Sequence, residues 1–223
     1  HFMLKEINQQ PEVIKNTLRG RVTEGSDTVQ LPDMQVTEQE LKDLKKIVIV
    51  SCGTAWHAGL VGKYLLEKFA QVPVEVDIAS EYRYRDPIVY PNTMVIPVTQ
   101  SGETADTLEA IRVAKKKGAK VVSIVNVVGS SIARESHGVI YTQAGPEIGV
   151  ASTKAYTSQI CVVHDLARRD AWRAFKGAGA RDDRAPSCDS RQDSVGARQS
   201  GGRHPLLEGP EISQCAERAV PWP

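Results

Sequence analysis

The sequence predicts an α/β domain with a doubly wound, parallel, five-stranded sheet, preceded by helices and followed by an irregular C-terminal tail. Up to about residue 160, short runs rich in β-branched residues alternate with amphipathic stretches. Several of these stretches have 12 or more residues, which is the length that a crossover between parallel strands needs. Small, hydroxyl-rich loops follow three of the runs. Together these features are typical of a parallel sheet covered by helices on both faces.

Five apolar runs are the expected strands: residues 46–51, 72–78, 93–99, 120–127 and 138–142. Helices are expected over 56–70 and 103–117 and from about Ser152 onward. Pro97 lies within the third run, which is unusual for a central strand because proline has no N–H to donate to a neighbouring strand. These elements define an α/β domain over residues 46–160.

Residues 1–45 form an expected N-terminal helical segment. Residues 4–18 have helical spacing, with Pro11 near the first or second turn, and residues 37–44 predict a short second helix. Thr37 followed by Glu40 is the pattern of a capping box. The chain begins with His1, which suggests that sequence upstream is missing and that the chain is a fragment.

The composition changes in the tail, residues 161–223. Lys outnumbers Arg by 12 to 6 up to residue 160, whereas the tail has 1 Lys, 9 Arg and three of the four cysteines. Residues 177–202 have no apolar period of either kind, so such a segment cannot bury enough surface to offset its ordering entropy. A disordered extension and a segment read out of frame both explain this change, and its abruptness favours the second. No function is assigned to the tail.

Composition also excludes several classes of function. The chain has 223 residues and a net charge of +1, with acids interspersed among the basic residues, so no nucleic-acid surface is expected. No apolar run approaches the roughly 18 residues that span a bilayer, so we expect a cytoplasmic protein without a membrane partner. Cys52, Cys161, Cys188 and Cys215 are widely spaced, so neither a metal site nor a disulfide framework is expected.

Four loops could carry chemistry, because ligands of open parallel sheets bind beyond the carboxyl ends of the strands. They cover residues 51–55, 99–104, 128–131 and 145–154. In the second, Ser101 could cap the next helix, Gly102 would let the backbone approach an anion, and Thr104 adds a hydroxyl. No Lys or Arg intervenes and no nucleotide-binding fingerprint is present, so a phosphorylated sugar fits better than a nucleotide. Helix capping alone also explains each loop taken singly.

The fourth loop adds Glu147, Ser152 and Lys154 between the last expected strand and a helix. It could line the same crevice. Alternatively, it is a capped helix start with a solvated Lys154, and the residues leave both interpretations open.

Three motifs carry a resemblance to a known family. They are Ser51-Cys52-Gly53-Thr54, Thr99-Gln100-Ser101-Gly102-Glu103-Thr104-Ala105-Asp106-Thr107 and Glu147-Ile148-Gly149-Val150-Ala151-Ser152-Thr153-Lys154. Together they resemble the first sugar isomerase (SIS) domain of glutamine:fructose-6-phosphate aminotransferases, over about residues 1–160. The resemblance implies a flavodoxin-like fold of the SIS type.

The resemblance further implies a role in converting fructose 6-phosphate to glucosamine 6-phosphate for amino-sugar synthesis, without a metal or organic cofactor. It implies that Gln100, Ser101 and Thr104 hold the phosphate, with Thr99 where the family often has Ser, and that Thr54, Val150 and Ser152 contact the sugar. Cys52, Gly53, Glu147 and Lys154 are further possible contacts. Ala55 departs from a serine common in the family, so one polar contact there is in doubt.

By the same resemblance, the catalytic base, the ring-opening His and the reactive Lys belong to a second SIS half or a C-terminal tail, and nothing after Ile160 matches them. We therefore expect no catalytic residue here: the chain would bind a sugar phosphate weakly without turning it over, whereas the full-length enzyme is expected to be a homodimer. Two alternatives remain, a non-catalytic sugar-phosphate-sensing module and an inactive truncated product. For a sensor, residues 1–45 are too acidic and too poor in Arg to resemble a DNA-binding helix-turn-helix.

Overall fold

The structure, a computed structural model, describes residues 1–22 and 29–168. Its centre is a sheet of five parallel strands: β1 (Lys46–Ser51), β2 (Val74–Ile78), β3 (Thr93–Thr99), β4 (Lys120–Val125) and β5 (Gly138–Tyr141). The strand order is β2-β1-β3-β4-β5, which is the flavodoxin-like order. The predicted fold class is confirmed.

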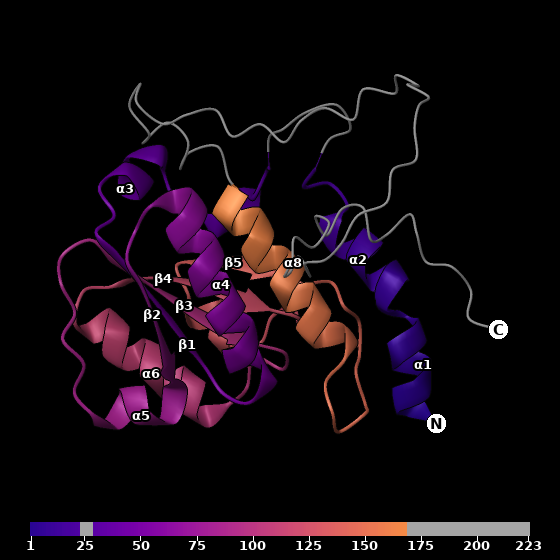
Figure 1. The fold of residues 1–223 in the computed structure, drawn as a ribbon. Helices are drawn as coiled ribbons and strands as arrows, with labels where there is room; N and C mark the ends of the chain where they lie inside the picture. The colour runs from indigo at the N-terminus through magenta and orange to yellow at the C-terminus, as the bar shows by residue number, and fades with distance from the viewer. Residues whose placement is uncertain (23–28, 169–223) are drawn as a thin grey trace, which may run out of the picture. The chain divides into compact units, whose positions relative to one another are not determined.

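Helices cover both faces of the sheet (Figure 1). On one face α4 (Thr54–Ala70) packs beside α8 (Lys154–Arg168), and the other face carries α5 (Ala79–Tyr84), α6 (Ala105–Lys116) and α7 (Ser131–Glu135). Strand β1 explains this arrangement, because successive side chains of a strand point to opposite faces. Ile47 and Ile49 join the core on the α4 side, whereas Val48 and Val50 join the core on the α6 side.

Pro97 lies in the middle of the sheet, since β3 pairs with both β1 and β4. The strand tolerates it with a local gap: the register with β4 includes Val95 and Val98 but neither Ile96 nor Pro97. A missing N–H explains an interrupted ladder on one side of the strand.

The N-terminal segment forms two helices where one was expected over residues 4–18. Helix α1 (Phe2–Asn8) and α2 (Gln10–Leu18) are separated by Gln9, which is the C-cap of α1 and the N-cap of α2, and Pro11 lies in the first turn of α2. Within one continuous helix, Pro11 would remove a hydrogen bond and its ring would clash with the preceding turn. A short 3₁₀-helix, η1 (Pro32–Met34), and α3 (Glu38–Lys42) follow, and the predicted capping box of Thr37 and Glu40 is present.

Helix α8 runs across the expected boundary at residue 160 and is described as far as Arg168. Val162, Val163 and Leu166 are buried in the core, and Asp165 is 4.0 Å from Arg21 of the N-terminal segment. The rest of the expected tail, residues 169–223, lies outside the described residues, so the structure does not test whether it is a disordered extension or is read out of frame.

Candidate functional site

A cavity of about 260 Å³ lies at the carboxyl edge of the sheet, where the loops after β1 and β3 diverge. In this strand order it is the point at which the direction of winding reverses, and open α/β sheets bind their ligands there. The loop that leads into α8 closes its third side. The lining residues are Cys52, Thr54, Ala55, Val98, Thr99, Gln100, Ser101, Thr104, Thr107, Glu147, Gly149, Val150, Ser152 and Gln159.

The loop after β3 is a tight turn stabilised by its own hydroxyls. Thr99 Oγ1 accepts a hydrogen bond from the amide of Gly102 at 3.3 Å, and Ser101 Oγ accepts one from the amide of Glu103 at 3.2 Å. This turn delays α6 to Ala105, so its N-cap is Thr104, and the expectation that Ser101 would cap the helix is wrong. Thr104 makes no side-chain capping hydrogen bond, which leaves first-turn N–H groups of α6 available to a ligand.

Helix α4 begins at the same cavity with the same feature. Its N-cap is Gly53, in a backbone conformation with φ 62°, and a glycine cannot supply a side-chain cap. Thr54 and Ala55, the first two residues of the helix, line the cavity. Two helix N-termini that lack side-chain caps therefore meet one small cavity, and each favours negative charge.

Glu147 closes the N-terminus of the third helix, α8. Its Oε1 accepts hydrogen bonds from the amides of Thr153 (2.8 Å) and Ala155 (3.3 Å), and its Oε2 accepts one from Ser152 Oγ (2.9 Å). The carboxylate thus serves as a helix cap. The Ser152 hydroxyl donates a hydrogen bond to Glu147, so its oxygen can still accept a hydrogen bond from a donor in the cavity.

Sequence reasoning missed Gln159, which lines the cavity from the second turn of α8. The residue is 3% exposed, and its Oε1 has no hydrogen-bond partner within residues 1–22 and 29–168. An unpaired buried amide oxygen costs free energy unless a ligand or water donates to it. The available signal was a Gln on the apolar face of a helix, among Ala155, Val162 and Leu166.

The structure brings most of the predicted contacts together: Cys52, Thr54, Thr99, Gln100, Ser101, Thr104, Glu147, Val150 and Ser152 line one cavity. Gly53 and Lys154 do not line it. The Lys154 side chain is buried and its Nζ lies 3.0 Å from Gln9 Oε1, so it is neither solvated nor a lining group.

The third predicted loop, residues 128–131, packs against the second predicted loop, residues 99–104. A Cβ on Gly102 would lie 2.1 Å from Ser130 Oγ and 2.5 Å from Ser130 Cβ, and Gly102 has φ 69°. The Ser131 amide donates to Glu103 Oε1 at 2.8 Å. This loop therefore fixes the turn at Gly102.

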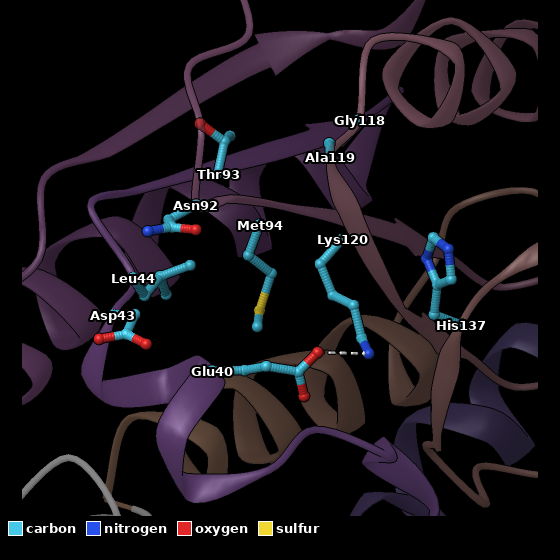
Figure 2. A pocket seen from close by; sticks show the side chains of 10 residues that line it. All are labelled: Glu40, Asp43, Leu44, Asn92, Thr93, Met94, Gly118, Ala119, Lys120 and His137. Atoms are coloured by element: carbon cyan, nitrogen blue, oxygen red, sulfur yellow. Dashed lines mark hydrogen bonds and ion pairs between the residues drawn. The ribbon is translucent and has the colours of Figure 1, made fainter.

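A larger cavity, about 410 Å³, lies at the opposite edge of the sheet, near the amino ends of β3 and β4 (Figure 2). Glu40 of α3 and Lys120 of β4 reach toward each other across it, with 2.8 Å between Oε1 and Nζ (Figure 2). Hydrogen bonds from Lys120 and the Thr37 amide lower the pKa of Glu40 to about 2. These charged groups already satisfy each other, so this cavity has less to offer a charged ligand.

Among the described residues, no group of three His, Cys, Asp or Glu side chains is placed to hold a metal ion, and no helix could cross a membrane. Cys52 and Cys161 are both free thiols, and burial raises the pKa of Cys161 to about 11.

Comparison with known proteins identifies the class. The SIS domain family matches residues 40–169, more than half of the chain, and the chain belongs to this family. Within it, the chain is 57% identical over 167 residues to the glutamine–fructose-6-phosphate aminotransferase (isomerizing) of Clostridium tetani and 58% identical over 167 residues to that of Chlorobaculum tepidum. The predicted resemblance to these aminotransferases is confirmed.

The chain spans only a part of these relatives. Each alignment covers 75% of this chain but 27% of the relative. A solved structure, the C-terminal domain of glucosamine-fructose-6-phosphate aminotransferase from Francisella tularensis, superposes with a TM-score of 0.71 at 41% identity. That superposition covers 78% of this chain and 49% of that one, so the chain corresponds to a portion of an isomerase region.

Proposed function

We propose that the chain is the first SIS domain of a glutamine:fructose-6-phosphate aminotransferase and that its carboxyl-edge cavity binds fructose 6-phosphate or a similar sugar phosphate. The observation that carries the proposal is the meeting of two helix N-termini without side-chain caps, those of α4 and α6, at one cavity. None of the described lining residues is Lys or Arg, so an anion there would be held by N–H groups, hydroxyls and helix dipoles.

The phosphate is assigned to the loop after β3. Ser101 and Thr104 offer hydroxyls on either side of the turn, Gln100 adds an amide, and α6 adds N–H groups of its first turn. The sugar would then extend toward the other two sides of the cavity, where Thr54 and Val150 line it.

The sugar hydroxyls find two acceptors in this part of the cavity. The Gln159 Oε1 is unpaired among the described residues. The Ser152 Oγ can accept a hydrogen bond, because its O–H already donates one to Glu147. A volume of about 260 Å³ also suits a small metabolite, since cavities for drug-sized ligands range over roughly 300–1,000 Å³.

Turnover is assigned to the longer protein. Glu147 is the one carboxylate that lines the cavity in the described part of the chain, and it is engaged at the start of α8. A general base must reach the proton that it removes, so we assign the base for the isomerisation to a part of the protein outside the described residues. The full-length protein is proposed to be a cytoplasmic homodimer that works without a metal or organic cofactor and supplies glucosamine 6-phosphate.

The test is isothermal titration of the full chain with fructose 6-phosphate, together with the double variant Ser101→Ala, Thr104→Ala. Each hydroxyl that donates to a charged phosphate contributes about 1.5 kcal/mol or more, so the double variant should bind about a hundredfold more weakly. Ser136→Ala removes a hydroxyl just before the amino end of β5 and is the matched control. Affinity unchanged in the double variant would refute the assignment of the phosphate to this loop.

A further inference from the structure

Helix α1 contains a buried carboxylate that the proposed site does not use directly. Glu6 is 4% exposed and is the one buried residue of the helix, whereas Phe2 and Leu4 are 61% and 62% exposed. A helix that serves only to complete a core buries an apolar stripe. Helix α1 instead buries a charge, and buried charges are rare unless they are paired or hydrogen-bonded.

The partners of Glu6 lie in the loop that forms the third side of the cavity, 142 and 143 residues away in the sequence. Its Oε1 accepts a hydrogen bond from the Ile148 amide at 2.6 Å, and its Oε2 accepts one from the Gly149 amide at 3.0 Å. No ion pair involves Glu6 within the described residues. Backbone amides of the loop therefore compensate the buried charge.

Gly149 is fitted to this carboxylate. A Cβ at Gly149 would lie 2.5 Å from Glu6 Oε2 and 3.4 Å from Met3 Cα, so a larger residue would displace the Glu6 carboxylate or the loop and disturb these hydrogen bonds. Glycine allows the close approach that two carboxylate hydrogen bonds require.

The loop needs this anchor because its tip has little packing of its own. Val150 is 106% exposed and follows directly after the clamped residues, and Gly149, Val150 and Ser152 all line the cavity. Glu147 fixes the loop where it enters α8, and Glu6 fixes residues 148 and 149. A freed loop would move the sugar contacts and leave the turn at residues 99–104 in place.

The N-terminal helices hold α8 at two further points. Gln9 Oε1 accepts a hydrogen bond from Lys154 Nζ at 3.0 Å, and Gln10 Oε1 accepts one from Thr157 Oγ1 at 2.6 Å. Within this short N-terminal stretch, Glu6 thus contacts the cavity loop itself, and Gln9 and Gln10 contact the start of α8 that follows it.

We propose that Glu6 is a positioning residue of the sugar-phosphate site, which sets the place of Gly149, Val150 and Ser152 through the amides of Ile148 and Gly149. The inference rests on the proposed function, because it assigns the residue to the sugar end of that cavity. It makes the N-terminal helices a part of the binding site, although neither helix supplies a lining residue.

The test compares Glu6→Gln with Glu12→Gln in the full chain. Both remove one negative charge from an N-terminal helix, but Glu12 is exposed on α2. Glu6→Gln replaces one acceptor oxygen by an NH2 group, which cannot accept a hydrogen bond from the loop N–H groups. We expect the Kd for fructose 6-phosphate to rise about tenfold, while the Kd for inorganic phosphate changes less than about twofold because the turn at residues 99–104 is intact. Gly149→Ala should reproduce this selective loss, and Glu12→Gln should leave both constants unchanged.

If Glu6→Gln weakened the binding of fructose 6-phosphate and of inorganic phosphate equally, the change would indicate a general loss of structure and overturn the inference. The inference would also be overturned if Glu6→Gln and Glu12→Gln bound fructose 6-phosphate with the same affinity. If the unaltered chain fails to bind fructose 6-phosphate, the proposed function is wrong, and hydrogen exchange then decides on the clamp itself. The amides of Ile148 and Gly149 should exchange about tenfold faster in Glu6→Gln than in Glu12→Gln. Equal exchange would refute the clamp whatever the ligand.

Discussion

The two edges of the sheet differ in a way that cavity size does not predict. The amino edge has the larger cavity, about 410 Å³, and the charged pair across it, Glu40 and Lys120, is joined at 2.8 Å. The carboxyl edge has the smaller cavity, about 260 Å³, where α4 and α6 start without side-chain caps and the Gln159 oxygen lacks a partner among the described residues. The amino edge also has one buried atom that is unpaired in the described part of the chain, Thr93 Oγ1. The two uncapped helix N-termini, rather than volume or a single unpaired atom, therefore indicate which edge is built for an anionic ligand.

The largest expected effect belongs to the amino edge and concerns stability alone. A Cβ at Gly138 would lie 1.7 Å from the backbone oxygen of Met34. Gly138→Ala should therefore lower the free energy of unfolding by about 3 kcal/mol, because backbone must move. Urea unfolding measures it. Gly118→Ala is the control, since Gly118 has φ 89° but open space and should cost only about 1 kcal/mol.

If Gly138→Ala were as stable as the unaltered chain, the close contact between η1 and β5 would be wrong. A folded Gly138→Ala that had lost sugar-phosphate binding, while Gly118→Ala kept it, would show that the two edges are coupled. Their separation in the present account would then fail.

An intermediate effect is expected at the carboxyl edge from Gln159→Leu. The change removes a buried acceptor from the cavity, so fructose 6-phosphate should bind about tenfold more weakly. The free energy of unfolding should stay the same or rise, because an unpaired buried polar group is replaced by an apolar one of similar size. Isothermal titration measures the change in affinity, and urea unfolding measures the change in the free energy of unfolding. An unchanged affinity would remove Gln159 from the proposed site.

The smallest effect is expected from Lys120→Met, which breaks the pair at the amino edge. Both partners are partly exposed, so the loss of stability at neutral pH should be about 0.5 kcal/mol. Since the Glu40 pKa is lowered from 4.5 to about 2, the pair contributes above pH 4.5 and its contribution disappears as the pH falls through about 2. The difference in stability between the variant and the unaltered chain should therefore vanish near pH 2, and affinity for fructose 6-phosphate should not change. A difference that persists or grows in acid would contradict the pairing.

Local patterns predicted most of the fold. The runs at β1 and β3 match the observed strands residue for residue, and the capping box before α3 is present, because strand alternation and capping depend on near neighbours. The start of α6 was predicted two residues too early. The turn that precedes it depends on hydroxyls that bind amides within the loop and on Ser130 packing behind Gly102.

The candidate site was predicted by its motifs more than by its geometry. The motifs identified most of the lining residues, but they did not reveal that Lys154 would contact Gln9 or that the Glu147 carboxylate would close α8. The clamp by Glu6 joins positions more than 140 residues apart. No local pattern contains such contacts, because they depend on how the N-terminal helices pack against the completed sheet.

The most direct test of the central claim is an amide-detected NMR titration of the full chain with fructose 6-phosphate. The ligand should shift the amides of residues 100–106 and 53–56 first, at the starts of α6 and α4, while residues 92–94 and 118–120 at the amino edge stay unchanged. Shifts confined to the amino edge would contradict the account and assign the ligand to the larger cavity.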